Sequence, residues 1–162
     1  MKIFGLRKRF YIPPLLALLF GYCLAFYYPH IEVNHVYKIL PVFTVYTEKT
    51  LNLDQAGTCR GIIILIRPSC KDDTTVKIHE LVHARQAYKS FFFYWLIAAV
   101  DDEYLAKIEC EAYATEIVNS NQIPIIARLI QTEYTPNVRY DIIEDYLMEY
   151  YKEPIIKKVY KS

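Results

Sequence analysis

The sequence predicts an α+β fold, in which a small sheet of roughly two to four strands precedes a bundle of about four helices. Three observations predict this fold. The chain of 162 residues is long enough for one compact domain with a short appendage. The stretch from Ile31 to about Pro68 is rich in β-branched and aromatic residues, as strands are. After Pro68, the residues that start and end helices recur along the chain.

The N-terminal segment predicts a membrane anchor. Residues 1–9 carry four basic side chains and no acid, and an uncharged apolar run, Phe10–Tyr28, follows them. As a helix this run covers about 28 Å, close to the roughly 30 Å of a bilayer's hydrocarbon core. We therefore divide the chain into an anchor, 1–29, and a domain, 30–162. A cleaved signal peptide and a buried helix of a soluble domain remain as alternatives.

The distribution of charge around the apolar run predicts its orientation. Positive charges before the run favour a cytoplasmic N-terminus, so the single-pass anchor would place the domain in the periplasm or outside the cell.

The first part of the domain reads as strands. Segments 31–40 and 42–50 are extended in character, and LDQAG at 53–57 marks a turn. The apolar stretch Gly61–Arg67 predicts a buried strand that ends at Pro68.

The next segment predicts a helix with a capped start. Asp72, Asp73 and Thr74 are the candidates for the N-cap, and the helix begins at Thr74 or Thr75. It carries the sequence TVKIHELVHARQAYKS.

The apolar run FFFYWLIAAV at 91–100 is too short to span a bilayer. We interpret it as a buried core helix, with contact to a headgroup layer as the alternative.

The rest of the chain predicts three helices. Asp101 or Asp102 caps the first, which continues to about Asn119. The other two cover 124–133 and 138–151.

Composition excludes one class of function and leaves one property open. The formal net charge is +1, from 19 basic and 18 acidic side chains, so there is no basic stripe for binding nucleic acid. The cysteines form no CxxC pair, and the redox state of Cys59, Cys70 and Cys110 is not fixed by their spacing.

The helix after the strands carries His79-Glu80-Leu81-Val82-His83. Residues four apart project from one helical face, so the two imidazoles can hold one metal ion. The carboxylate of Glu80 lies beside that face and can act as general base toward a water activated by the metal. The motif therefore predicts a Zn²⁺ site for hydrolysis, with His79 and His83 as ligands.

A catalytic zinc needs three protein ligands and an open position. No third histidine follows at the HExxHxxGxxH spacing, because Gln86 and Lys89 occupy the matching positions. The third ligand should be a carboxylate from a later helix, and Glu109 and Glu111 are the candidates. These two lie about 200° apart around a helix, so only one can face the metal.

The octet His79–Gln86, HELVHARQ, resembles the HELVHxRQ signature of small bacterial and phage metallopeptidases. It is also similar to the gluzincins, a group that includes integral-membrane zinc proteases. The resemblance covers about residues 58–118 and implies a zincin-like domain. It also implies that Gly61–Arg67 forms the rim of the cleft and pairs with an extended substrate.

The resemblance extends to the later helix. In gluzincins the third ligand is the glutamate of an ExxAD-like motif, which falls on Glu109, with the alanine on Ala112. Tyr113 stands where that motif has an aspartate that orients a histidine ligand.

The function expected from these residues is zinc-dependent cleavage of peptides or proteins, with Glu80 as general base. The alternative is a membrane-associated binding or assembly protein that is catalytically inactive and stabilised by zinc. Substrate identity, oligomeric state and the residue that stabilises the oxyanion stay open.

Overall fold

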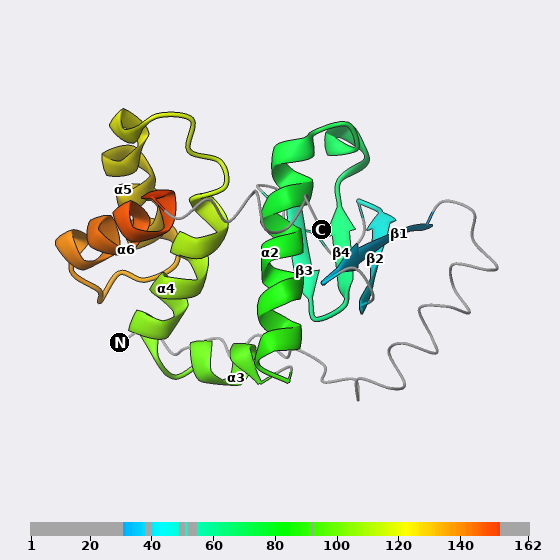
Figure 1. The fold of residues 1–162 in the computed structure, drawn as a ribbon, viewed down its shortest axis with the longest axis horizontal. Helices are drawn as coiled ribbons and strands as arrows, with labels where there is room; N and C mark the ends of the chain where they lie inside the picture. Colours follow the sequence, from blue (N-terminus) through cyan, green and yellow to red (C-terminus); the bar gives the residue numbers. More distant parts are fainter. Residues whose placement is uncertain (1–30, 38–39, 49–50, 52–54, 92, 153–162) are drawn as a thin grey trace.

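The computed structural model describes residues 31–37, 40–48, 51, 55–91 and 93–152. Within them the α+β class is confirmed, because four strands precede the helices (Figure 1). The elements are β1 (Ile31–Val36), β2 (Leu40–Tyr46), β3 (Gly57–Arg60), β4 (Ile63–Ile66), the 3₁₀ helix η1 (Pro68–Cys70), α2 (Thr74–Lys89), α3 (Tyr94–Ala98), α4 (Asp102–Tyr113), the 3₁₀ helix η2 (Ser120–Gln122), α5 (Ile123–Glu133) and α6 (Tyr140–Lys152).

The sheet is mixed, with the strand order β1-β2-β4-β3. β1 pairs with β2 antiparallel, β2 with β4 parallel, and β4 with β3 antiparallel. The prediction that Gly61–Arg67 forms the rim is wrong, because β4 has a hydrogen-bonded strand on each side. The edge beyond it is β3, which the sequence did not predict as a strand.

A tight turn explains why β3 exists. Arg60 pairs with Ile63, so Gly61 and Ile62 form a two-residue loop, and Gly61 has φ 76°. A positive φ at the first loop position favours glycine and matches a type II′ hairpin. The chain therefore reverses at the start of Gly61–Arg67, the segment that was predicted as one strand, and Gly57–Arg60 pairs back against it.

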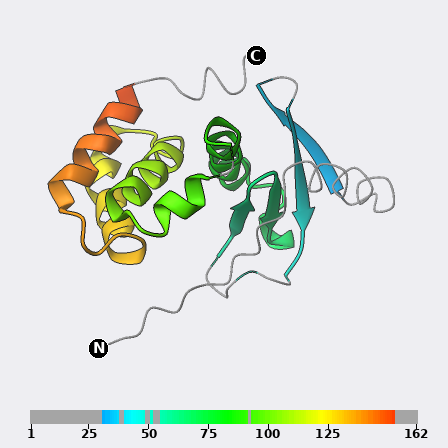
Figure 2. The ribbon, with the colours of Figure 1, turned by 90° about the horizontal axis from the view of Figure 1, so that it is seen from below.

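Helix α2 lies between the sheet and the helices α4, α5 and α6 (Figures 1 and 2). Asp73 caps it as predicted, accepting hydrogen bonds from the backbone N–H groups of Thr75 at 2.9 Å and Val76 at 3.3 Å. Leu81 and Ala84 join the buried core of the sheet. The face with His79 and His83 is turned to α4, as the contacts of these side chains show.

The last three helices enclose a second core. Its buried members come from α4, α5, α6 and the connections between them: Ala106, Cys110, Ile117, Ile123, Ala127, Ile130, Val138, Ile143 and Leu147. The predicted helices at 124–133 and 138–151 are confirmed within one or two residues at each end by α5 and α6.

Helix α4 begins after the cap residue Asp101, as predicted, but ends at Tyr113, earlier than the expected Asn119. The hydroxyl of Thr115 donates to the carbonyl of Ala112 at 2.7 Å, and the chain then turns. Asn119 instead forms a capping box with Gln122 at the start of η2.

The prediction of a core helix at 91–100 is wrong for most of its length. Helix α3 covers Tyr94–Ala98 only, and Tyr94 and Ala98 are buried. Phe91, Phe93, Leu96, Ile97 and Val100 are exposed.

The predicted anchor, Phe10–Tyr28, lies outside the described residues. No helix among the described residues has the length and apolarity needed to cross a bilayer. Cys59, Cys70 and Cys110 are free thiols.

Candidate metal centre

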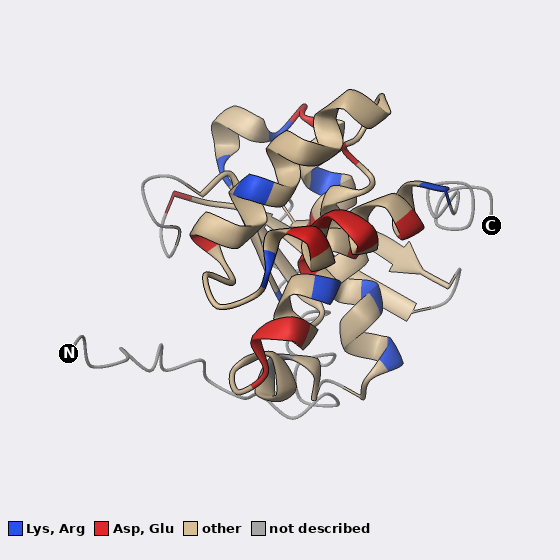
Figure 3. Ribbon diagram, turned by 90° about the vertical axis from the view of Figure 1, so that its left-hand side faces the viewer, with Lys and Arg blue, Asp and Glu red and all other residues tan. Residues whose placement is uncertain are grey.

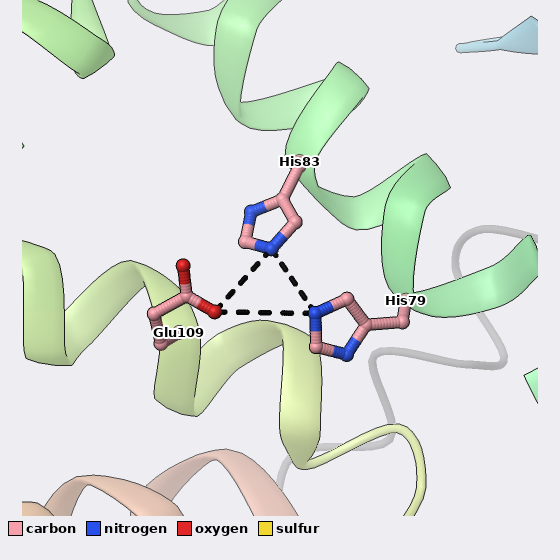
Figure 4. A group of neighbouring side chains, drawn as sticks. All are labelled: His79, His83 and Glu109. Atoms are coloured by element: carbon pink, nitrogen blue, oxygen red, sulfur yellow. Dashed lines mark hydrogen bonds and ion pairs between the residues drawn. The ribbon is translucent and has the colours of Figure 1, made fainter. Parts of the chain in front are cut away.

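Helices α2 and α4 bring three potential ligand atoms together (Figure 4). His79 Nε2 lies 3.2 Å from His83 Nε2, and Glu109 Oε2 lies 3.9 Å from the first nitrogen and 3.6 Å from the second. All three side chains are buried. This buried group could hold a metal ion.

His83 is oriented by Gln86, three residues further along α2. Gln86 Nε2 donates to the carbonyl of Ile108 at 3.0 Å and to Glu111 Oε2 at 2.9 Å. These two acceptors fix the amide so that its oxygen faces His83 Nδ1 at 2.9 Å. Nδ1 therefore donates, and Nε2 of the neutral ring presents a lone pair.

His79 is oriented by an acid from beyond α4. Its Nδ1 donates to Glu116 Oε1 at 2.6 Å, so its Nε2 also presents a lone pair in the neutral ring. The ring of Tyr113 packs edge-on against His79, with the ring centroids 4.6 Å apart. Glu116 thus accepts a hydrogen bond from His79 and orients its ring, which is the role that an aspartate has in the family motif, where this chain has Tyr113.

Three lone pairs converging on one point repel each other unless a proton or a metal cation lies between them. Ligand atoms about 2.0–2.2 Å from a tetrahedral ion lie roughly 3.3–3.6 Å from each other. The observed separations of 3.2, 3.6 and 3.9 Å are close to that triangle. The donor set of two nitrogens and one oxygen therefore fits a divalent metal ion.

The electrostatics of the site favour positive charge. Burial acts to lower the pKa of His83, but Glu109 and Glu80 outweigh burial and raise the pKa to about 9. The negative potential that favours a proton on this imidazole also favours a divalent cation.

Of the two glutamates proposed as third ligand, the structure places Glu109 in the ligand group. Glu111 lies against Gln86 Nε2 instead, and so acts on His83 through the amide. The two carboxylates point to different partners on α2, as their angular separation on the helix requires.

Glu80 is buried, and its Oε2 has no hydrogen-bond partner among the described residues. Burial raises the pKa of this carboxyl, and the neighbouring His83 and His79 act in the opposite direction. A buried carboxylate oxygen without a hydrogen-bond partner is costly, and a bound molecule that donates a hydrogen bond to it would offset this cost.

Gly57 of β3 packs directly against Glu80. A Cβ at position 57 would lie 3.0 Å from Glu80 Oε1 and 3.1 Å from its Cγ. The edge strand can approach the carboxylate this closely only because residue 57 is a glycine.

Two phenols stand beside the ligands. The hydroxyls of Tyr113 and Tyr134 lie 3.2 Å apart, and Tyr134 is partly exposed. Burial raises the pKa of both groups, so both remain protonated at neutral pH and can donate hydrogen bonds.

Sequence reasoning missed the residues that orient the imidazoles. Gln86 is the last residue of the motif His79–Gln86, but its position in the sequence did not show which histidine ring it would contact. Glu116 lies three residues beyond the end of α4, so no helical spacing relates it to Glu109, and the sequence carried no signal for its contact with His79.

Comparison with protein-family models gives no match, and neither do comparisons with curated proteins and with solved structures. Function is therefore inferred from the residues of the site.

Replacing Glu116 tests the orientation of His79. We expect Glu116→Ala to weaken the affinity for a divalent metal ion about 10- to 100-fold, because His79 loses the acceptor that fixes its tautomer and its ring. Competition with a chromophoric chelator measures this change. Glu133→Ala removes an exposed glutamate of α5 and should leave the affinity unchanged. Equal affinity in both variants would mean that Glu116 does not orient His79.

Proposed function

We propose that the chain is a zinc-dependent peptide hydrolase. The observation that carries the proposal is the unpartnered carboxylate oxygen of Glu80 on the helix that presents His79 and His83. A metal held only to stabilise the fold requires the ligands but not this carboxylate. The resemblance of residues 79–86 to metallopeptidases supports the same reaction.

Each residue has a defined task in this proposal. A bound Zn²⁺ would polarise the substrate carbonyl and lower the pKa of water. His79, His83 and Glu109 would hold the ion, and three protein ligands are the number that a catalytic zinc takes. Glu80 takes the proton of the attacking water and returns it to the leaving amine.

The edge strand β3 offers a track for the substrate. It is the last strand of the sheet and packs beside α2, and its first residue, Gly57, contacts Glu80. An extended peptide that adds to this edge would pass close to the general base. The substrate class we propose is therefore a peptide in extended conformation.

Residue 57 gives a direct test of this arrangement. We expect Gly57→Ala to lower kcat about tenfold with zinc content unchanged, because the added methyl group displaces Glu80 but contacts no ligand. Steady-state kinetics beside zinc analysis measures both. Thr132→Ala, at an exposed position of α5, serves as the control. Unchanged kcat in Gly57→Ala would show that the position of Glu80 is not limiting.

The proposal as a whole is tested with the zinc-loaded chain and a broad peptide library, with products identified by mass spectrometry. We expect cleavage that stops when zinc is chelated and returns when zinc is restored. A protein that binds zinc tightly and cleaves nothing would favour the alternative, a zinc-stabilised binding or assembly protein.

We also propose that the apolar run Phe10–Tyr28 tethers the domain to a membrane. Its length and its lack of charge support this assignment. The basic residues before it support a domain in the periplasm or outside the cell.

A further inference from the structure

The connection between α2 and α4 exposes a group of large apolar side chains. They occur within ten consecutive residues, and their exposed fractions range from 42% to 87%. We call them the α3 patch: Phe91, Phe93, Leu96, Ile97 and Val100. Tyr94 and Ala98 of the same segment are buried and attach it to the domain. Soluble monomers rarely expose so many large apolar groups together, and such patches mark interaction sites.

The backbone at Phe91 is a second unusual feature of this segment. Phe91 has φ 50° and directly follows Ser90, the C-cap of α2. Glycine or asparagine is the usual residue in this left-handed position, since a bulky side chain is strained there. The phenylalanine is strained and also 79% exposed, so neither backbone conformation nor packing within the domain explains it.

The α3 patch contains no charged residues, but charged residues lie on either side of it in the sequence. Residues 91–100 contain no charged side chain, whereas Lys89 precedes them and Asp101 and Asp102 follow. Figure 3 shows the charged residues of the domain in colour, and α3 carries none. An apolar surface with aromatic members and charges only at its margin suits the boundary between headgroups and acyl chains.

We propose that the α3 patch inserts into the surface of a lipid bilayer. This inference rests on the proposed tether. The apolar run ends at Tyr28, and β1 begins at Ile31, so the connection spans at most about 11 Å. A domain held that close to a bilayer meets it continually, and an exposed apolar patch then has a partner of matching chemistry within reach.

The contact would define which substrates the site meets. α3 connects α2 to α4, the two helices that supply His79, His83 and Glu109 (Figure 1). Insertion of α3 would fix the height and tilt of both helices above the bilayer. The peptide segments within reach are then those close to a membrane surface.

Photo-cross-linking of the full chain tests the inference. The protein is reconstituted in phosphatidylcholine vesicles that contain a lipid with a diazirine in its acyl chain, and cross-linked residues are mapped by mass spectrometry. We expect lipid adducts in 10–28 and in 91–100. In the double variant Leu96→Glu/Ile97→Glu, the yield of adducts in 91–100 should fall at least tenfold relative to the yield in 10–28, because charges on the patch oppose insertion. Both positions are exposed, so the fold tolerates the change.

A matched control carries the same change elsewhere. Val118→Glu/Ile125→Glu alters two exposed apolar residues outside the patch and should leave both sets of adducts unchanged. Thermal unfolding of each variant confirms that it is folded.

The possible results distinguish between the inference about the α3 patch and the proposed membrane tether. Adducts in 10–28 alone overturn the inference and leave the tether standing. Adducts in 91–100 alone support insertion and overturn the tether, and adducts in neither overturn both. Protein–protein cross-links that join 91–100 of two chains also overturn it, because a second copy then covers the patch. None of these results depends on peptidase activity.

Discussion

Glu80→Gln is expected to lower the rate of peptide hydrolysis by about 10²- to 10⁴-fold, with zinc bound at about one ion per chain. Glutamine keeps the shape of the side chain but cannot accept a proton from water. The three ligand atoms belong to other residues, so the ion should remain bound. This combination of full metal content and lost turnover is what a general base predicts and what a structural metal site does not.

The measurement pairs steady-state hydrolysis of a library-derived peptide with zinc analysis of the same sample. Glu133→Gln makes the same chemical change at an exposed position of α5 and should behave as wild type. A Glu80→Gln protein with zinc bound and near-normal turnover would remove Glu80 from the mechanism. Loss of zinc in that variant would instead make Glu80 part of the metal's support.

Glu109→Ala is expected to weaken zinc binding by well over 100-fold, whereas Glu111→Ala weakens it about 10- to 100-fold. Glu109 supplies an atom of the ligand group, but Glu111 acts one step further away, through Gln86 and His83. Removing Glu109 also leaves two imidazole nitrogens 3.2 Å apart without their counter-charge. The first variant should therefore be isolated without zinc and the second with partial zinc.

Thermal unfolding with and without added zinc gives an independent reading of the same assignment. A ligand that binds only the folded state, at a free concentration 100 times its Kd, stabilises it by about 2.7 kcal/mol. We expect zinc to raise the Tm of the wild type and of Glu111→Ala, and to leave the Tm of Glu109→Ala unchanged. The reverse pattern would make Glu111 the ligand.

The sequence was informative where structure is set by near neighbours. The start of α2 follows from Asp73, whose side chain reaches the next backbone N–H groups, and the cap of α4 at Asp101 has the same origin. The pairing of His79 with His83 follows from helical geometry alone. Each of these depends on residues no more than four positions apart.

The sequence was less informative where distant contacts decide. Gly57–Arg60 is too short to show strand alternation and becomes a strand because it pairs with β4. Glu116 reaches His79 because α4 stops at Tyr113. The resemblance favoured Glu109 over Glu111, and the placement of α4 against α2 brings Glu109 to the two histidines.

The apolar run at 91–100 shows a further limit. Composition indicates that these side chains avoid water, but it does not indicate which surface covers them. Among the side chains of this run that the structure describes, Tyr94 and Ala98 are buried in the domain, whereas Leu96 and Ile97 on the same short helix are exposed.

The hydrogen bonds that orient the two imidazoles also connect α2 with α4 and with the segment that follows α4. Gln86 donates hydrogen bonds to Ile108 and Glu111, and His79 donates one to Glu116, 37 residues away. We therefore expect the geometry of the three ligand atoms to depend on the packing of α2 against α4. A metal ion bound by His79, His83 and Glu109, as proposed, would link α2 to α4 as well, so we expect removal of the ion to weaken the packing of the two helices before either helix unfolds.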